Sequence, residues 1–487
     1  MTQSIVRCWL ASFALIGFVC GAHISWGNDT KSDAQVAQDA IVAMKKATNF
    51  MRSRVAVHGG YVYSVTLDLK TRRGEGLATS TEIWVQPPGT PKVGSSFVQA
   101  FDSTGDSTFF EAASECARAL IHGQLESGGW TDRVDFNPNG ANTGLYRSGK
   151  GKTKGRNYST LDDDKSQAAI RFLIELDRSG KFQDSAVHES VQFALDALLK
   201  AQFTNGGFPQ GWSKPVEPVP VVQATFPTYD WRTEGRFKNY WDFATLNDGL
   251  AGTVTKTLQL AYETYSDERY RIAMLKFGDF LILAQLPEPQ PAWAQQYNHQ
   301  LQPIWARKFE PPAIVGSESK DAMNTLMYLT EVTGERRFLK PIPAAIAWLK
   351  RSQLPDGQMA RFYELQTNKP LYFTKDQYEL TYDDSNLPTH YSFKGKSNVT
   401  QLETRYTSLA KHGPSQKTKA NIKSSRKAVE RILSEQDSEG RWITDKKGNP
   451  IMDIEGREQS ELFLESKVFS KNLGLLADFV TAVRNGE

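Results

Sequence analysis

The sequence predicts an all-α-dominated fold, an α/α toroid of paired helices, with small β excursions in its loops and near its N-terminus. Three observations lead to this prediction. Apolar residues recur at three- and four-residue steps, a glutamine-led turn returns at long intervals, and strand-like alternation is confined to residues 60–67 and 81–85. Loops that follow the helices are expected to gather at one mouth of the ring.

The helical pattern is distributed over most of the chain. It covers residues 166–176, 187–201, 250–265, 273–286, 322–333, 344–352, 419–435 and 473–483. Cys116 lies in a further amphipathic stretch, where we expect it to pack in the core as a small hydrophobe.

Related turns end many of these helical runs. They start at Gln124, Gln202, Gln285, Gln353 and Gln436, and the first runs Gln-Leu-Glu-Ser-Gly-Gly-Trp. Glycine ends a helix readily because it adopts the left-handed backbone region. One helix pair cannot bury its apolar face alone, so repeated pairs pack side by side. Their spacing exceeds that of common solenoid repeats, which favours a closed ring over an open solenoid.

The N-terminus has the pattern of an export signal. Arg7 precedes an apolar run at residues 8–20, and small or polar residues follow up to Gly27. A membrane-spanning helix needs about 20 apolar residues, more than this run contains. We therefore expect residues 1–27 to be a signal peptide, the protein to be secreted or periplasmic, and no membrane span to remain after cleavage. Residues 28–487 should form a single domain, since no low-complexity linker divides them.

The charge balance excludes a nucleic-acid partner. The 487 residues include 58 Lys+Arg and 55 Asp+Glu, for a formal charge of +3, and no Lys/Arg-rich block is present.

Three adjacent carboxylates, Asp162 to Asp164, stand directly before a predicted helix. Two interpretations remain open. Asp163 or Asp164 could cap the helix, or the run could hold a hard divalent cation, for which Ca²⁺ is the natural candidate. The spacing does not match an EF-hand loop.

Other loops combine aromatic, cationic and amide side chains. Aromatic rings stack on sugars, whereas Arg and Lys bind carboxylates, so this combination suits an acidic polysaccharide. The candidate substrate-binding residues are Asn247, Trp293, Lys308, Arg361 and Lys375.

Six segments carry a resemblance to a known family. They are Thr160-Leu-Asp-Asp-Asp, Asn205-Gly-Gly-Phe-Pro-Gln, Leu246-Asn-Asp, Ala306-Arg-Lys-Phe-Glu-Pro-Pro, Gly316-Ser-Glu-Ser and Ala360-Arg-Phe-Tyr-Glu-Leu-Gln-Thr-Asn-Lys-Pro. In this order they resemble the pectate lyases of polysaccharide-lyase family ten, over about residues 110–395. The resemblance implies an α/α toroid, a Ca²⁺ requirement and cleavage of polygalacturonate by β-elimination, and we expect a monomer.

The resemblance also implies roles for individual residues. Arg307 would be the catalytic base, Asp162 and Asp248 would act around Ca²⁺, and Arg361 and Lys375 would hold substrate carboxylates. Asp163 could share the metal role of its neighbour.

The sequence departs from the family pattern in three places. Lys375 stands where the family has Arg, Phe208 replaces a Trp, and residues from about 213 to 242 form an enlarged loop. Lysine keeps the charge but loses two-pronged carboxylate binding.

Three other classes of protein remain open. An inverting glycoside hydrolase would pair Asp163 with Asp248 or Glu318. A terpenoid cyclase would want an acidic residue at Leu161. A carbohydrate-binding protein without activity would keep its aromatic residues and tolerate loss of Arg307.

Overall fold

The computed structural model describes residues 31–140, 143–149, 155–234, 236–389, 391–414, 422–447, 451–452 and 458–486. The predicted signal peptide, residues 1–27, lies outside them. The described residues contain twelve α-helices, so the helix-dominated fold is confirmed.

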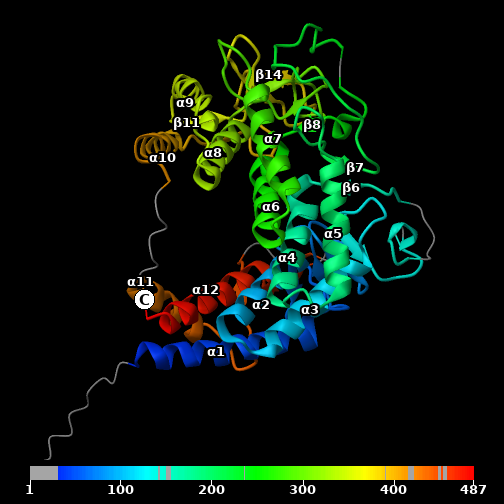
Figure 1. Cartoon of the computed structure of the whole chain (residues 1–487), viewed down its shortest axis with the longest axis vertical. Helices are drawn as coiled ribbons and strands as arrows, with labels where there is room; N and C mark the ends of the chain where they lie inside the picture. The colour runs from blue at the N-terminus through cyan, green and yellow to red at the C-terminus, as the bar shows by residue number, and fades with distance from the viewer. Residues whose placement is uncertain are drawn as a thin grey trace, which may run out of the picture.

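The helices with even numbers form one continuous row (Figure 1). Each packs against the next in the order α12, α2, α4, α6, α8, α10. Their bounds are α2 (Thr90–Thr104), α4 (Lys165–Ser179), α6 (Leu250–Tyr265), α8 (Gly316–Thr333), α10 (Val399–His412) and α12 (Ser466–Arg484).

The odd-numbered helices form a second layer against this row. They are α1 (Asp33–Phe50), α3 (Ser107–His122), α5 (Ser185–Lys200), α7 (Glu268–Ala284), α9 (Ile342–Arg351) and α11 (Ile422–Ser434). Buried alanine, leucine and phenylalanine side chains fill the space between the layers, and Cys116 is among the buried residues, as predicted.

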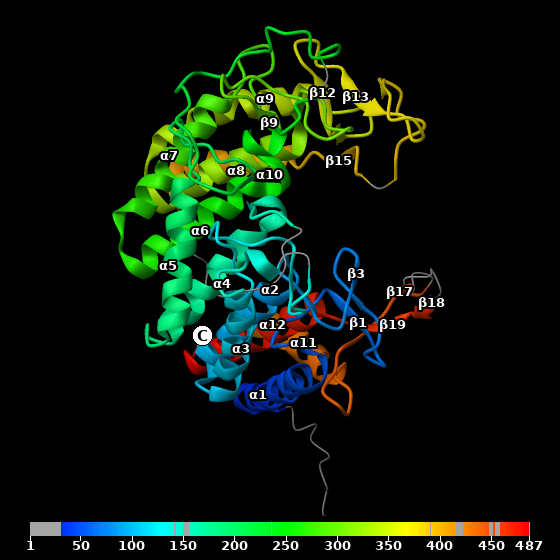
Figure 2. The same cartoon turned by 90° about the vertical axis from the view of Figure 1, so that its right-hand side faces the viewer.

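The two layers curve into an arc with α10 at one end and α12 at the other. Figures 1 and 2 both show these two helices well apart. The described helices therefore form an open arc, and the closed ring stays a prediction. None of the helices in the described part of the chain combines the length and the apolar character that crossing a membrane needs.

The strands are short and lie in the loops. One sheet has the order β16 (Ile443–Asp445), β19 (Leu462–Glu465), β1 (Ser64–Thr66), β2 (Arg72–Arg73), β3 (Leu77–Ala78), and another β10 (Ala313–Val315), β12 (Phe362–Glu364), β13 (Pro370–Phe373), β14 (Leu380–Thr381). Two-stranded pairs are β4 (Glu82–Trp84) with β5 (Arg133–Asp135), β6 (Ser159–Thr160) with β7 (Gly211–Trp212), β8 (Ala244–Thr245) with β9 (Gln296–Tyr297), β11 (Gln358–Ala360) with β15 (Lys394–Lys396), and β17 (Ile451–Met452) with β18 (Glu458–Ser460). Both predicted strand regions are confirmed in shortened form, by β1 and β4.

Glutamines of the recurring turns join neighbouring helix pairs. Each Nε2 group donates to a carbonyl four to six residues ahead in its own turn and to a second carbonyl in or beside the next odd-numbered helix. The bonds are Gln124 to Gly128 and Ser190, Gln202 to Gly206 and Ala273, Gln285 to Pro291 and Pro341, and Gln436 to Gly440 and Ala43, all 2.9–3.2 Å. The last link ties α11 to α1, so it joins the two ends of the chain.

Gln353 breaks this series. Its side chain is exposed and donates to Ser397 Oγ at 2.9 Å. It stands at the end of α9, where the next link would reach α11. The missing link thus coincides with the opening of the arc.

The two kinds of glutamine should differ in their effect on stability. We expect Gln124→Ala to lower the free energy of unfolding by about 2–4 kcal/mol, because the buried amide satisfies several buried polar groups. Gln353→Ala, the matched control, should change it by about 0.5 kcal/mol or less. Denaturant unfolding of both variants measures the difference, and equal losses would contradict the assigned role.

Candidate active site

Two turns of the same design precede α4 and α6. They are η3 (Asp162–Asp164) and η5 (Asn247–Gly249), and each follows a short strand and a Thr-Leu pair. In both turns the threonine hydroxyl accepts a hydrogen bond from the backbone N–H two residues ahead, at 3.1 Å, for Thr160 from Asp162 and for Thr245 from Asn247. The threonine therefore fixes both turns in the same way.

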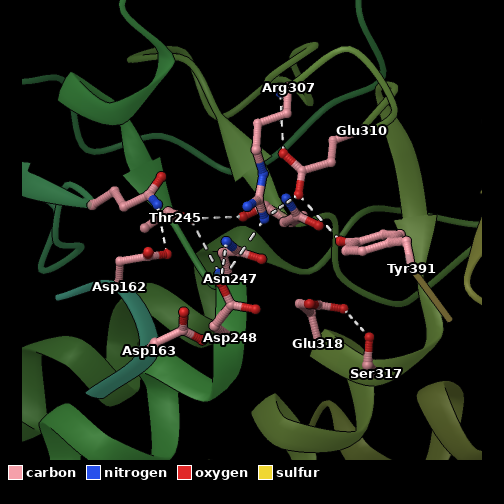
Figure 3. Close-up of polar contacts among 12 residues, drawn as sticks. Asp162, Asp163, Thr245, Asn247, Asp248, Arg307, Glu310, Ser317, Glu318 and Tyr391 are labelled. Atoms are coloured by element: carbon pink, nitrogen blue, oxygen red, sulfur yellow. Dashed lines mark hydrogen bonds and ion pairs between the residues drawn. The ribbon is translucent and has the colours of Figure 1, made fainter. Parts of the chain in front are cut away.

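The middle residue of each turn is an aspartate in the left-handed backbone region. The angle φ is 48° at Asp163 and 52° at Asp248. Few residues other than glycine adopt this conformation, although aspartate is enriched there. Because α4 packs against α6 and the two turns contact each other, the two carboxylates are brought to one place (Figure 3).

Three carboxylates form the centre of the site, which we call the carboxylate cluster. Oxygen atoms of Asp162, Asp163 and Asp248 lie within 4.8 Å of one another. Asp162 Oδ1 accepts a hydrogen bond from Gln210 Nε2 at 2.8 Å, and its Oδ2 accepts one from Lys165 Nζ at 2.9 Å. The structure thus brings together the three residues that the sequence predicts as metal ligands.

The three carboxyl groups differ in pKa because each lies close to the charges of the others. Burial and the charges of Asp163 and Asp162 raise the pKa of Asp248 well above its usual range. Burial and Asp162 also raise the pKa of Asp163. Burial acts in the same direction on Asp162, but Lys165 outweighs it, so the pKa of Asp162 is lowered. Of the three carboxyl groups, protonation of Asp248 would relieve this repulsion most readily, because burial and both neighbouring charges raise its pKa.

Asp164 takes no part in the cluster. It stands at the N-cap of α4 but makes no side-chain capping hydrogen bond. Its Oδ2 instead accepts a 2.5 Å hydrogen bond from Arg171 Nη2. The capping interpretation of the aspartate run is therefore wrong for this residue.

The donor set of the carboxylate cluster fits a hard divalent cation. All its ligand atoms are oxygens, which Ca²⁺ prefers. Beside the cluster, Asn247 Oδ1 is buried and has no hydrogen-bond donor among the described residues, while its Nδ2 donates to Asp248 Oδ2 at 2.5 Å. A cation here would offset the crowded negative charge.

Arg307 reaches the cluster from the loop that leads to β10. Its Nη2 lies 3.9 Å from Asp248 Oδ2 and 2.6 Å from Glu310 Oε1. Glu310 is only 2% exposed, accepts a second bond from the Arg307 backbone at 3.1 Å, and accepts a third from Tyr391 Oη at 3.2 Å. Burial lowers the pKa of Arg307, but Glu310 outweighs it, so the net pKa is raised.

Arg361 lies just before β12 and contacts Tyr391 and Glu318. Its guanidinium stacks over the Tyr391 ring at 4.1 Å from the centroid, and its Nη2 lies 3.6 Å from Glu318 Oε1. Glu318 in turn accepts a hydrogen bond from Ser317 (Figure 3). Arg307 and Arg361 are thus connected through Tyr391 and Glu310.

The two predicted lysines lie on the surface. Lys308 is exposed, with its ammonium over the Tyr378 ring at 4.8 Å. Lys375 is exposed between β13 and β14. Both ammonium groups are therefore accessible from solvent.

Trp293 was predicted to bind substrate, and the structure shows that this prediction is wrong. Its side chain is 0% exposed, and its indole N–H donates to the Leu281 carbonyl at 2.7 Å. Trp130 and Trp442 make the same bond to the helix before them. The tryptophan of the recurring turn is therefore a core residue that locks the turn to its helix, and it cannot stack on a sugar.

Four residues of the site were not predicted from the sequence: Lys165, Gln210, Glu310 and Tyr391. Gln210 and Glu310 lie inside segments that carry the family resemblance, and Lys165 follows the aspartate run directly, so position could have indicated all three. Tyr391 comes 30 residues after Arg361, and no local pattern marks it.

Comparison with known proteins gives the class of the site-bearing segment. Residues 124–360, just under half of the chain, match the family described as pectic acid lyase. This match places the segment among the polysaccharide lyases. The resemblance to pectate lyases is therefore confirmed for it. No curated protein matches the chain.

Several solved structures are similar to this chain. A family 10 polysaccharide lyase from Cellvibrio cellulosa, solved as a mutant in complex with trigalacturonic acid, has 20% identity and a TM-score of 0.46, covering 66% of this chain and 98% of its own. A sugar epimerase from a ruminal bacterium has 10% identity and a TM-score of 0.47, covering 92% and 98%. The cellobiose 2-epimerase of Spirochaeta thermophila has 14% identity and a TM-score of 0.44, covering 93% and 98%.

The raised pKa of Asp248 predicts a pH-dependent stability. In chelator, the folded protein keeps a proton that an unfolded aspartate loses, so stability falls as pH rises through the raised pKa. Asp248→Asn removes this loss. We expect the variant to be more stable than the wild type by about 1–3 kcal/mol near pH 8, and the gain to be smaller near pH 5.

Thermal unfolding in chelator at both pH values measures the effect. Asp376→Asn, at an exposed position, is the control and should change neither midpoint. A gain that does not depend on pH would contradict the assignment.

Proposed function

We propose that this protein is an exported, Ca²⁺-dependent lyase that cleaves polygalacturonate by β-elimination. The observation that supports it most strongly is the meeting of the three-carboxylate cluster with Arg307, inside the segment that matches pectic acid lyases. The related lyase from Cellvibrio cellulosa binds trigalacturonic acid, which agrees with an acidic polysaccharide as substrate.

The reaction requires positive charge beside a carboxylate. Removal of the C5 proton of a galacturonate builds a second negative charge next to the first, and the C4–O bond then breaks to leave a 4,5-unsaturated sugar. Groups that neutralise this developing charge lower the barrier. Ca²⁺ held by Asp162, Asp163 and Asp248 would supply part of that neutralisation. Arg361 and Lys375 would hold carboxylates of the polymer.

Arg307 is the residue proposed to take the C5 proton. Glu310 holds its guanidinium in a fixed position and raises the pKa of Arg307, which favours the protonated form. Arginine can accept a proton only in its neutral form, so a second positive charge close to Asp248 would have to disfavour the charged form of Arg307. Arg307 would therefore have to release one guanidinium proton to water before it takes the C5 proton, while Glu310, which also accepts a hydrogen bond from Tyr391, holds the side chain in place.

Geometry disfavours an inverting hydrolase that uses Asp163 and Asp248. Such enzymes keep their two carboxyl groups about 6.5–9.5 Å apart, to leave room for a water molecule. Oxygen atoms of Asp163 and Asp248 lie within 4.8 Å of each other. A carbohydrate-binding protein without activity can be told apart from a lyase by experiment, because it would release no unsaturated product.

The proposal includes three further elements. Export through a signal peptide at residues 1–27 would deliver the enzyme to a secreted or periplasmic substrate. We also propose that the helical arc closes into a toroid and that the protein acts as a monomer. Amino-terminal sequencing of the mature protein tests the first element, and solution scattering tests the other two.

The proposed activity predicts a conjugated product. The wild-type protein should raise the ultraviolet absorbance of a polygalacturonate solution, and a Ca²⁺ chelator should abolish the rise. Excess Ca²⁺ should then restore it. Release of reducing ends without absorbance would identify a hydrolase, and binding without either signal would identify a carbohydrate-binding protein.

Arg307→Lys should separate turnover from binding. We expect kcat to fall by about 10²–10⁴-fold, because the proton acceptor is altered, while KM changes by about threefold or less because the charge remains. Arg269→Lys, an exposed arginine of α7, is the matched control and should leave both constants unchanged. Unchanged turnover in Arg307→Lys would remove Arg307 as the base.

A further inference from the structure

Lys165 distinguishes the two turns that form the carboxylate cluster. It is the first residue of α4, directly after η3, and the equivalent first residue of α6, after η5, is Leu250. Leu250 is buried among apolar side chains. One of two otherwise similar helix starts therefore carries a cation where the other carries a hydrophobe.

The Lys165 side chain is 8% exposed, so its ammonium group is fixed rather than solvated. Nζ lies 2.9 Å from Asp162 Oδ2 and 3.9 Å from Asp163 Oδ2. A buried ammonium is retained only where it is paired and hydrogen-bonded. The two aspartates meet that condition, so lysine and cluster depend on each other.

The charge balance of the site indicates how the Lys165 ammonium would affect a divalent metal ion bound by the carboxylate cluster. Three carboxylates face two cationic groups, Lys165 and Arg307, and Arg307 is shared with Glu310. A divalent ion bound by the cluster would meet the Lys165 ammonium at the same Asp162 carboxylate. Like charges at such distances in a partly buried site repel strongly.

We infer that Lys165 is a built-in counterion that competes with the divalent cation for Asp162 and thereby weakens cation binding by the cluster. This inference rests on the Ca²⁺ site of the proposed function. The lysine lets the crowded aspartates fold without metal, and its charge makes the bound metal easier to release. Gln210 Nε2, which donates to the other oxygen of Asp162, keeps that carboxylate aligned for either cation.

Lys165→Met tests the inference directly, because methionine keeps much of the side-chain volume and removes the charge. We expect the variant to bind Ca²⁺ about tenfold more tightly than the wild type, since one repelling unit charge is lost. In chelator, its melting temperature should fall below that of the wild type, because the carboxylates lose their counterion. Added Ca²⁺ should raise that temperature more in the variant than in the wild type.

The measurement is isothermal titration of CaCl₂ into the full mature chain, with melting temperature against Ca²⁺ concentration as the second readout. Lys165→Arg keeps the charge and should bind Ca²⁺ within about twofold of the wild type. Lys320→Met removes a lysine of α8 whose ammonium donates to the Lys396 carbonyl, and it should leave Ca²⁺ affinity unchanged. If Lys165→Met folds only with Ca²⁺, Lys165→Gln serves in its place and the Ca²⁺ dependence itself supports the inference.

The outcomes separate this inference from the proposed function. Equal or weaker Ca²⁺ binding in Lys165→Met, with normal binding in the wild type, overturns the counterion role and leaves the lyase proposal standing. Absence of Ca²⁺ binding in the wild type and all variants overturns both. Tighter binding in Lys165→Arg as well would show that the change of side chain, rather than its charge, matters, and would also overturn the inference.

Discussion

Mutual repulsion among Asp162, Asp163 and Asp248 is the constraint around which this part of the molecule is arranged. Three carboxylates with oxygens within 4.8 Å of one another are stable only where protons, cations or hydrogen-bond donors offset them. The protein supplies cations and hydrogen-bond donors: Lys165 and Gln210 for Asp162, and Asn247 and Arg307 for Asp248. The positive ends of two helix dipoles add to them. The packing of α4 against α6 keeps the carboxylates from moving apart.

The cationic half of the site is organised by a buried acid. Glu310 anchors the Arg307 side chain and backbone and accepts a hydrogen bond from Tyr391, whose ring supports Arg361. One carboxylate thus positions two arginines that come from loops more than fifty residues apart in the sequence. Both halves of the site are therefore networks of opposite charges in which no member is independent.

Much of this could be predicted from the sequence, for identifiable reasons. Helical periodicity and the glutamine turns reveal the paired helices because both patterns are local. The three cluster aspartates were found because they lie in short polar segments before helices. Helices α1, α2 and α10 were not singled out; in α10 only Val399, Leu402 and Leu409 are buried, so its apolar stripe is short. Trp293 was misassigned because exposure depends on tertiary packing, and Tyr391 was missed because its partners are distant in sequence.

The pairing of the chain's two ends has a consequence for biogenesis. Helix α12 packs against α1 and α2, strand β19 pairs with β1, and Gln436 donates to Ala43 on α1. The core around α1 and α2 is therefore incomplete until α12 has been synthesised. In a growing chain, the apolar faces of α1 and α2 that α12 covers stay exposed until α12 has been made, so this part of the core forms late.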